Sequence, residues 1–230
     1  MIRLHFIVEG QTEETFVNRV LSHFLGQYMI SVDVRRIETS RRSGKIYRGG
    51  ITEYIKIKKD VTLWMKEDQN NDAFFTTMFD LYALPNDFPE FTLAKQSNDA
   101  YDRVEIMEQA FEKDISDPRF IPYIQLHEFE ALILSDPRCF DWEFINHNKA
   151  ISQLIEVCSQ FDSPELINDN PNTAPSKRII QLIPEYQGRK SSAGSLIAEK
   201  IGIPSIAAKC PHFAAWLKRL VALSTEIPDL

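Results

Sequence analysis

The chain has 230 residues, of which 43% are hydrophobic and 26% charged, so it can form one sizeable core and lacks the composition of a disordered protein. Its 26 basic and 33 acidic residues give a net charge of −7, which argues against a protein that coats nucleic acid non-specifically. Three separated cysteines without a CxxC pair argue against a zinc ribbon and a disulfide framework. The sequence has no apolar run of roughly 20 residues and no long apolar stretch at its start, so we expect a cytoplasmic protein without membrane contact.

The first half of the sequence predicts alternating strands and helices. Short apolar, β-branched runs predict strands at residues 3–8, 29–37, 72–80 and 120–126. Apolar residues at helical spacing predict intervening helices, which we expect to begin with a cap at Thr12, to cover residues 51–66 and 101–115, and to start near His127. This order is typical of parallel βαβ units, whose right-handed crossovers bring the carboxyl ends of the strands to one edge.

The pattern changes near Cys139, after which helical segments are punctuated by prolines and no strand is indicated. We therefore predict an α/β domain over residues 1–138, in which helices flank a parallel sheet, and a helical region over residues 139–230 packed on it.

Acidic residues follow three of the predicted strands. Glu9 ends the first strand, Asp80 ends the third, and Glu128 and Glu130 follow the fourth. Each acid alone has a structural explanation, such as a helix cap, an ion pair or a first-turn acid favoured by the helix dipole. Together they predict a site at one sheet edge that offers the oxygen ligands preferred by Mg²⁺.

Three segments, "IVEGQTEETF", "TTMFDLYALPNDFPEF" and "RFIPYIQLHEFEALILSDP", closely resemble a bacterial family described as a domain of unknown function and grouped with the Toprim (topoisomerase–primase) fold. The functional relatives it is most similar to are Toprim nucleases of the overcoming-lysogenization-defect type. The resemblance also reaches "APSKRI" and "CPHFAAWLKRL", so it covers nearly the whole chain.

The resemblance implies a Toprim-like Rossmannoid sheet and a metal site. Glu9 matches the glutamate that follows the first Toprim strand, and Asp80 matches the first acid of the Toprim DxD pair. Tyr82 stands where the second acid would be, so Glu128 or Glu130 would supply the missing ligand. The implied metal ligands are therefore Glu9, Asp80, Glu128 and Glu130.

The activity implied by the resemblance is hydrolysis of a nucleic-acid phosphodiester with Mg²⁺ or Mn²⁺, with DNA favoured over RNA. Glu9 would act as a ligand or as a general base through water, with Asp80 and Glu128 as its catalytic partners. Lys177 or Lys190 would stabilise the transition-state phosphate, although an exposed lysine on a solvated helix is the simpler interpretation of either.

A basic segment follows the second predicted strand, and we expect residues 40–50 to form a loop there. Arg41, Arg42, Lys45 and Arg48 would grip a nucleic-acid backbone, or the segment is simply solvated.

Family relatives also imply a partner, an ABC-type or AAA-type ATPase encoded nearby, and a role in antiviral defence; homodimerisation stays open.

Two alternatives to the nuclease interpretation remain. A non-catalytic Toprim-like subunit that binds a partner is supported by Tyr82, and a hydrolase of a small phosphorylated molecule is allowed by the net acidity and the compact size.

Overall fold

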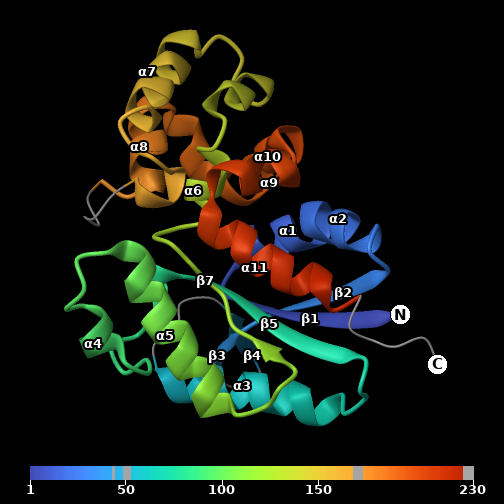
Figure 1. The fold of residues 1–230 in the computed structure, drawn as a ribbon. Helices are drawn as coiled ribbons and strands as arrows, with labels where there is room; N and C mark the ends of the chain where they lie inside the picture. The colour runs from blue at the N-terminus through green and yellow to red at the C-terminus, as the bar shows by residue number, and fades with distance from the viewer. Residues whose placement is uncertain (43–44, 49–52, 168–172, 225–230) are drawn as a thin grey trace.

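The computed structural model describes residues 1–42, 45–48, 53–167 and 173–224, and it describes only the backbone for residues 38–42 and 45–48. At its centre is a parallel sheet with the strand order β2-β1-β5-β6, in which β7 also pairs with β5 (Figure 1). These strands are β1 (Ile2–Val8), β2 (Ile30–Arg36), β5 (Ala73–Asp80), β6 (Phe120–Ile121) and β7 (Ile124–Gln125). The predicted α/β class and parallel sheet are confirmed.

The prediction of one continuous strand over residues 120–126 was wrong, because the structure has two short strands there. Pro122 has no N–H for the ladder, and the run divides into β6 and β7 around it. The Thr77 side chain fills the gap, because its hydroxyl donates to the Tyr123 carbonyl and accepts from the Tyr123 N–H, both at 3.0 Å.

Each face of the sheet carries its own apolar core, because side chains alternate along the strands. Leu4 and Phe6 of β1 join one core, beneath α1 (Gln11–Phe16) and α11 (Pro211–Ala222), whereas Ile7 joins the other, over α3 (Tyr54–Glu67) and α5 (Ala100–Ile115) (Figure 1). Helix α1 continues through a π-helical turn, η1 (Val17–Leu21), into α2 (Ser22–Gly26). On the α11 side, buried Trp216 donates to Thr76 Oγ1 at 2.9 Å and so ties the end of the chain to β5.

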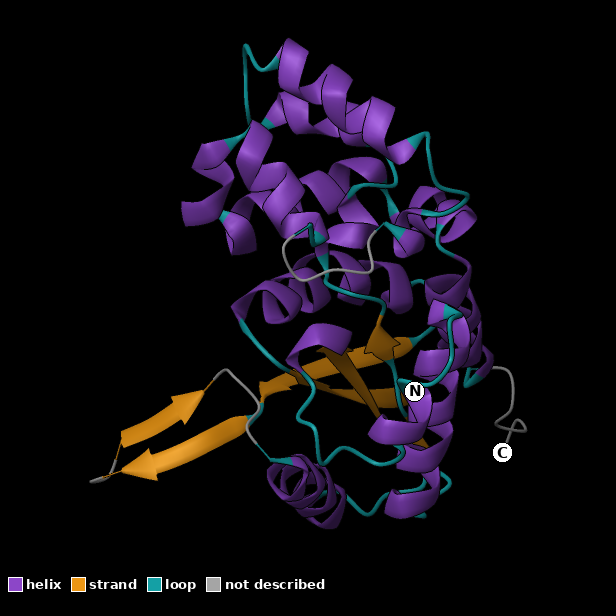
Figure 2. Cartoon of the chain, turned by 90° about the vertical axis from the view of Figure 1, so that its left-hand side faces the viewer, coloured by secondary structure: helices purple, strands orange, loops and turns teal. Residues whose placement is uncertain are grey.

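Two local predictions differ from the structure. Thr12 does not cap the first helix, because α1 begins at Gln11 with Gly10 as its N-cap, and the Glu13 carboxylate accepts the Gly10 N–H at 2.9 Å. The segment expected to be a loop over residues 40–50 instead contains two antiparallel strands, β3 (Glu38–Arg42) and β4 (Lys45–Arg48), which project away from the sheet (Figure 2).

Short helical turns join the later elements, and the second half of the chain is helical as predicted. Beyond Gln125, the described residues form no strand. Two short helical elements, η2 (Leu81–Ala83) and α4 (Phe91–Ala94), follow β5. The helical elements between β7 and α11 are α6 (Glu130–Ile133), η3 (Pro137–Trp142), α7 (Asn148–Cys158), η4 (Pro164–Leu166), α8 (Pro175–Leu182), η5 (Pro184–Gly188), α9 (Lys190–Ile201) and α10 (Ile203–Lys209).

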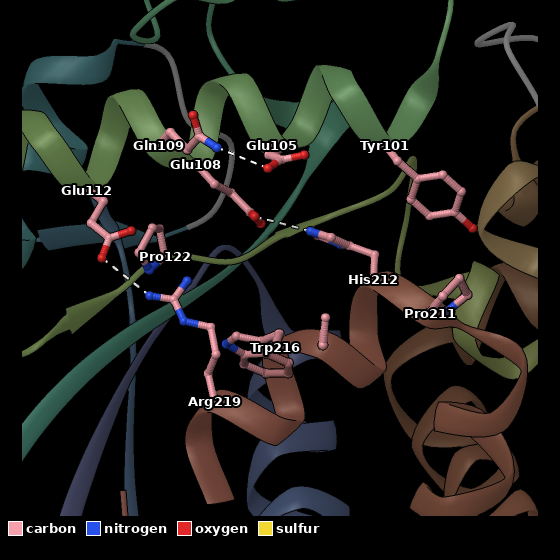
Figure 3. Close-up of a pocket in the computed structure, with 11 residues that line it drawn as sticks. Tyr101, Glu105, Glu108, Gln109, Glu112, Pro122, Pro211, His212, Trp216 and Arg219 are labelled. Atoms are coloured by element: carbon pink, nitrogen blue, oxygen red, sulfur yellow. Dashed lines mark hydrogen bonds and ion pairs between the residues drawn. The ribbon is translucent and has the colours of Figure 1, made fainter. Parts of the chain in front are cut away.

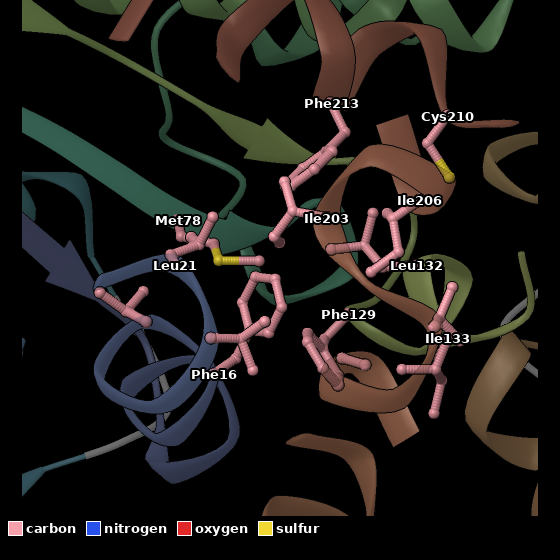
Figure 4. Packing of buried hydrophobic residues seen from close by; sticks show 14 of the residues in the cluster. Phe16, Leu21, Met78, Phe129, Leu132, Ile133, Ile203, Ile206, Cys210 and Phe213 are labelled. Atoms are coloured by element: carbon pink, nitrogen blue, oxygen red, sulfur yellow. The ribbon is translucent and has the colours of Figure 1, made fainter. Parts of the chain in front are cut away.

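The helical region shares its core with the α/β part of the molecule. Helix α9 packs against α1 and α6, and Phe16, Met78, Phe129 and Phe213 lie in one buried cluster (Figure 4). No helix in the described part of the chain has the length and apolar character that crossing a membrane requires.

Candidate acidic site at the carboxyl edge of the sheet

Glu9 and Asp80 lie at the same edge of the sheet. Strands β1 and β5 are adjacent and parallel, with Val8 paired to Met78, so Glu9, one residue after Val8, and Asp80, two residues after Met78, lie at the same end of the sheet. A hydrogen bond from the Asp80 backbone to the Glu9 carboxylate opposes the rise in the pKa of Glu9, which places the two residues in contact. The predicted neighbourhood of Glu9 and Asp80 is therefore present.

The segment that carries Glu128 and Glu130 is bonded to Asp80. The Phe129 N–H, between the two glutamates, donates to Asp80 Oδ1 at 2.9 Å. The prediction of a helix starting near His127 was wrong, since α6 begins at Glu130 and His127 has a left-handed backbone with φ of 61°. The resulting bend brings both glutamates to the edge where β1 and β5 end.

Glu13 is a fifth acid of this group. Its side chain is 6% exposed, and its charge is a cause of the raised pKa values of Glu9, Asp80 and Glu130. Glu13 is not one of the predicted metal ligands. Its sequence signal is its position four residues after Glu9, on the first turn of the helix that leaves the sheet edge. We call Glu9, Glu13, Asp80, Glu128 and Glu130 the carboxylate cluster.

Burial and mutual repulsion raise the proton affinity of this cluster. Burial raises the pKa of Glu9 to about 7, and the charges of Glu13 and Glu128 contribute. Burial also raises the pKa of Asp80 well above its ordinary range, and the charges of the other four cluster members add to it. Burial raises the pKa of Glu130 to about 7 although Lys190 opposes the rise. The fold therefore holds several carboxyl groups where their ionised forms are unfavourable.

Hydrogen bonds fix the outer members of the carboxylate cluster. Glu128 Oε2 accepts the Ser176 N–H at 2.9 Å, at the start of α8. Buried Glu130 accepts the Tyr186 hydroxyl at 3.2 Å and lies 3.5 Å from Lys190 Nζ. Among the residues that the structure describes, no three or more His, Cys, Asp or Glu side chains are placed to share a metal ion. The donor atoms thus have the chemistry of a hard-cation site, but they are held by protein partners.

The predicted cations fall in different places. Lys190 lies beside Glu130, and its charge opposes the rise that burial causes in the pKa of Glu13 and of Glu130. Lys177 follows Ser176 on α8, and its side chain is exposed. Of these two lysines, Lys190 is the one whose ammonium group lies beside a member of the cluster. The side chains of the other four predicted cations lie outside the described residues, although their backbones form β3 and β4: Arg41, Arg42, Lys45 and Arg48.

A cavity of about 470 Å³ lies elsewhere, between α5 and α11 (Figure 3). No member of the carboxylate cluster lines it. Its charged walls are paired, since His212 Nε2 lies 3.1 Å from Glu108 Oε2, and Arg219 donates to Glu112 Oε1 at 3.3 Å. These contacts join α11 to α5 and give the cavity walls a structural role.

The fold and this edge define an α/β protein with an acidic cluster at the carboxyl ends of a parallel sheet, the usual position of sites in such sheets. A family model described as "Domain of unknown function (DUF4276)" matches residues 8–221, and the chain belongs to this family. The comparison with curated proteins and the comparison with solved structures each gave no match. The family description assigns no activity, so the nuclease interpretation stays a prediction.

Proposed function

We propose that this protein is a Mg²⁺- or Mn²⁺-dependent hydrolase of nucleic-acid phosphodiesters, with the carboxylate cluster as its active site. The observation that carries the proposal is the convergence of five acids, four of which have a pKa that burial raises: Glu9, Glu13, Asp80 and Glu130. Like charges held together cost stability, and strongly perturbed groups in such clusters are candidates for functional sites. The resemblance to Toprim nucleases supports the same chemistry.

The donor atoms are of the type that a hard divalent cation prefers, because all five side chains offer carboxylate oxygens. Glu9, Asp80 and Glu128 would hold the ion, and Glu130 would serve as a further ligand. A bound Mg²⁺ or Mn²⁺ supplies an activated water and neutralises charge on the phosphate.

The protein's own groups have separable tasks in this proposal. Glu9 would act either as a ligand of the ion or, with the pKa of about 7 that it has without a metal, as a general base that accepts a proton from water. Lys190 lies at the cluster and can neutralise charge on the phosphate, a role for which Lys177 is the second candidate. The Phe129 N–H orients Asp80, so Phe129 is a positioning residue.

DNA is the proposed substrate, and the basic β3–β4 hairpin is its proposed contact. Because the net charge is −7, binding of a phosphate backbone requires a local basic region. The sequence provides one at Arg41, Arg42, Lys45 and Arg48. The ABC-type or AAA-type ATPase partner and the antiviral role rest on the family resemblance alone.

The test is cleavage of supercoiled plasmid and of RNA with Mg²⁺ or Mn²⁺, alone and with the neighbouring ATPase. We expect the wild-type protein to cut, and Glu9→Gln and Asp80→Asn to lose at least ~10²-fold in rate. Glu156→Gln, an exposed acid on α7, is the matched control and should cut normally. A wild-type protein that cuts neither substrate under all these conditions refutes the proposal, and active Glu9 and Asp80 variants refute the site.

One observation favours a second candidate, a non-catalytic subunit that binds a partner: the described acids are not placed to share a metal ion. Titration calorimetry with Mn²⁺ separates the two functions. Mn²⁺ binding that Asp80→Asn abolishes supports the hydrolase, whereas no Mn²⁺ binding together with a stable ATPase complex supports the subunit.

A further inference from the structure

A smaller cavity of about 300 Å³ lies between the segment that follows β5 and the helices α4 and α5. Leu81 and Tyr82, which line it, directly follow Asp80 in the chain. Its volume is at the lower end of the range of about 300–1,000 Å³ that is usual for small-ligand sites. It has room for a single small molecular unit rather than for a duplex.

The lining of this cavity combines three kinds of chemistry. Tyr82 and Phe91 offer aromatic rings, and the Tyr82 side chain remains 36% exposed. Lys95 and Arg103 bring positive charge, and the Asn86 amide can both donate and accept hydrogen bonds. The remaining lining residues are apolar: Leu81, Leu84, Ala94 and Met107.

These groups match the parts of a nucleotide. Bases stack on aromatic rings, an amide reads their hydrogen-bonding edges, and lysine and arginine bind the attached phosphate. The larger cavity between α5 and α11 offers the opposite charge, since its wall from α5 carries Glu105, Glu108 and Glu112. A phosphate-bearing ligand is therefore expected in the smaller cavity.

Tyr82 connects this cavity to the carboxylate cluster. Its ring lies 5.3 Å from the His127 ring, and its N–H donates to the His127 carbonyl at 3.4 Å. His127 immediately precedes Glu128, so a ligand that stacks on Tyr82 lies beside the segment that carries two of the acids.

We infer that this cavity is a nucleotide pocket, which holds one unpaired base on Tyr82 and places the adjoining phosphodiester over Asp80; the inference rests on the proposed function. It gives Tyr82 a reason to stand where a Toprim domain has its second acid, because a stacking ring replaces a metal ligand there. The substrate class that follows is single-stranded nucleic acid, or a strand end.

The pocket can be tested without cleavage, by calorimetric titration of the metal-free protein in EDTA with AMP, adenosine and ribose 5-phosphate. We expect AMP to bind more tightly than either fragment, because only AMP carries both base and phosphate. Tyr82→Ala should weaken AMP binding roughly 5- to 100-fold, whereas Tyr82→Phe, which keeps the ring, should bind almost normally. Lys95→Ala should weaken AMP but leave adenosine unchanged.

Equal binding of AMP and ribose 5-phosphate, or unchanged AMP binding in Tyr82→Ala, overturns the pocket. The outcome is independent of the cleavage assay, since no metal is present. Glu9→Gln should keep AMP binding while losing cleavage. If Tyr82→Ala weakens AMP binding but the protein cuts nothing, the nucleotide pocket is supported and the hydrolase proposal fails. If the protein cuts but Tyr82→Ala leaves AMP binding unchanged, the hydrolase proposal is supported and the nucleotide pocket fails.

Discussion

Replacing Glu9 by Gln should stabilise the protein above neutral pH, because it removes a charge that the fold disfavours. Burial, with the charges of Glu13 and Glu128, raises the pKa of Glu9 from an ordinary 4.5 to about 7. Between these values the folded protein keeps a proton that the unfolded chain releases, so stability falls as the pH rises through this interval. Above it, the wild-type protein bears the full penalty and Glu9→Gln does not.

The size of the effect follows from the shift. A rise of this extent corresponds to at most about 3 kcal/mol, and the partial exposure of Glu9 to water makes about 1–2 kcal/mol the expected gain. For a chain of this length, that gain raises the melting temperature by roughly 2–8 °C at pH values above the raised pKa. Below the ordinary carboxyl pKa, both proteins carry a neutral group at this position and should melt within about 1 °C of each other.

The assay is thermal unfolding by circular dichroism in EDTA, across the interval from acid to mildly alkaline pH. Glu156→Gln is the control, because that side chain is exposed on α7, and its melting temperature should follow wild type throughout. A Glu9→Gln protein that is less stable than wild type above neutral pH, or a difference that does not depend on pH, would refute the reasoning. The first result would mean that the Glu9 charge is compensated inside the fold.

Three further predictions concern the cluster, the packing that supports it, and the contact between α5 and α11. Mn²⁺ at about 100 times its Kd should stabilise the wild-type protein by about 2.7 kcal/mol in thermal unfolding and leave Asp80→Asn unchanged; equal shifts would exclude Asp80 as a ligand. Gly194→Ala puts a methyl group 3.0 Å from Phe129 Cε1 and 3.1 Å from the Tyr186 hydroxyl, so it should cost about 1–3 kcal/mol in urea unfolding, whereas Gly188→Ala meets no atom within 4 Å and should be neutral. Burial lowers the pKa of His212, but Glu108 and neighbouring carboxylates raise it by more. Glu108→Gln should therefore lower the free energy of unfolding by about 1 kcal/mol in acid, and by less as the pH rises through the raised pKa of His212. A loss of stability that is equal in acid and in alkali would contradict this prediction.

The sequence alone determined the class of fold and the edge at which the acids gather. Apolar, β-branched runs and helical spacing are local properties, and β1, β2, β5, α3 and α5 lie within a few residues of their expected bounds. The position of Glu9 and Asp80 followed from parallel connectivity, which places strand ends together whatever the details of packing. Their adjacency needed no knowledge of side-chain contacts.

Tertiary structure decided what the local pattern left open. The expected fourth strand divides at Pro122 because Thr77 of β5 bonds the backbone there, and the expected helix start moves to Glu130 because His127 adopts a left-handed turn. Thr77 lies 46 residues from Tyr123 along the chain, and Asp80, which bonds the Phe129 N–H ahead of α6, lies 49 residues from Phe129. The basic segment pairs with itself as β3 and β4, although its composition reads equally well as a loop.

The environment of the acids was also beyond the sequence. Residue types and strand ends identified Glu9, Asp80, Glu128 and Glu130, but the inclusion of Glu13 depends on how α1 leaves the sheet. The preference for Lys190 over Lys177 depends on α9 packing beside α6, about 60 residues away in the chain. Burial and like charges raise the pKa of Glu9, Asp80 and Glu130, and both are properties of the assembled fold, because they sum over neighbours that only folding brings together.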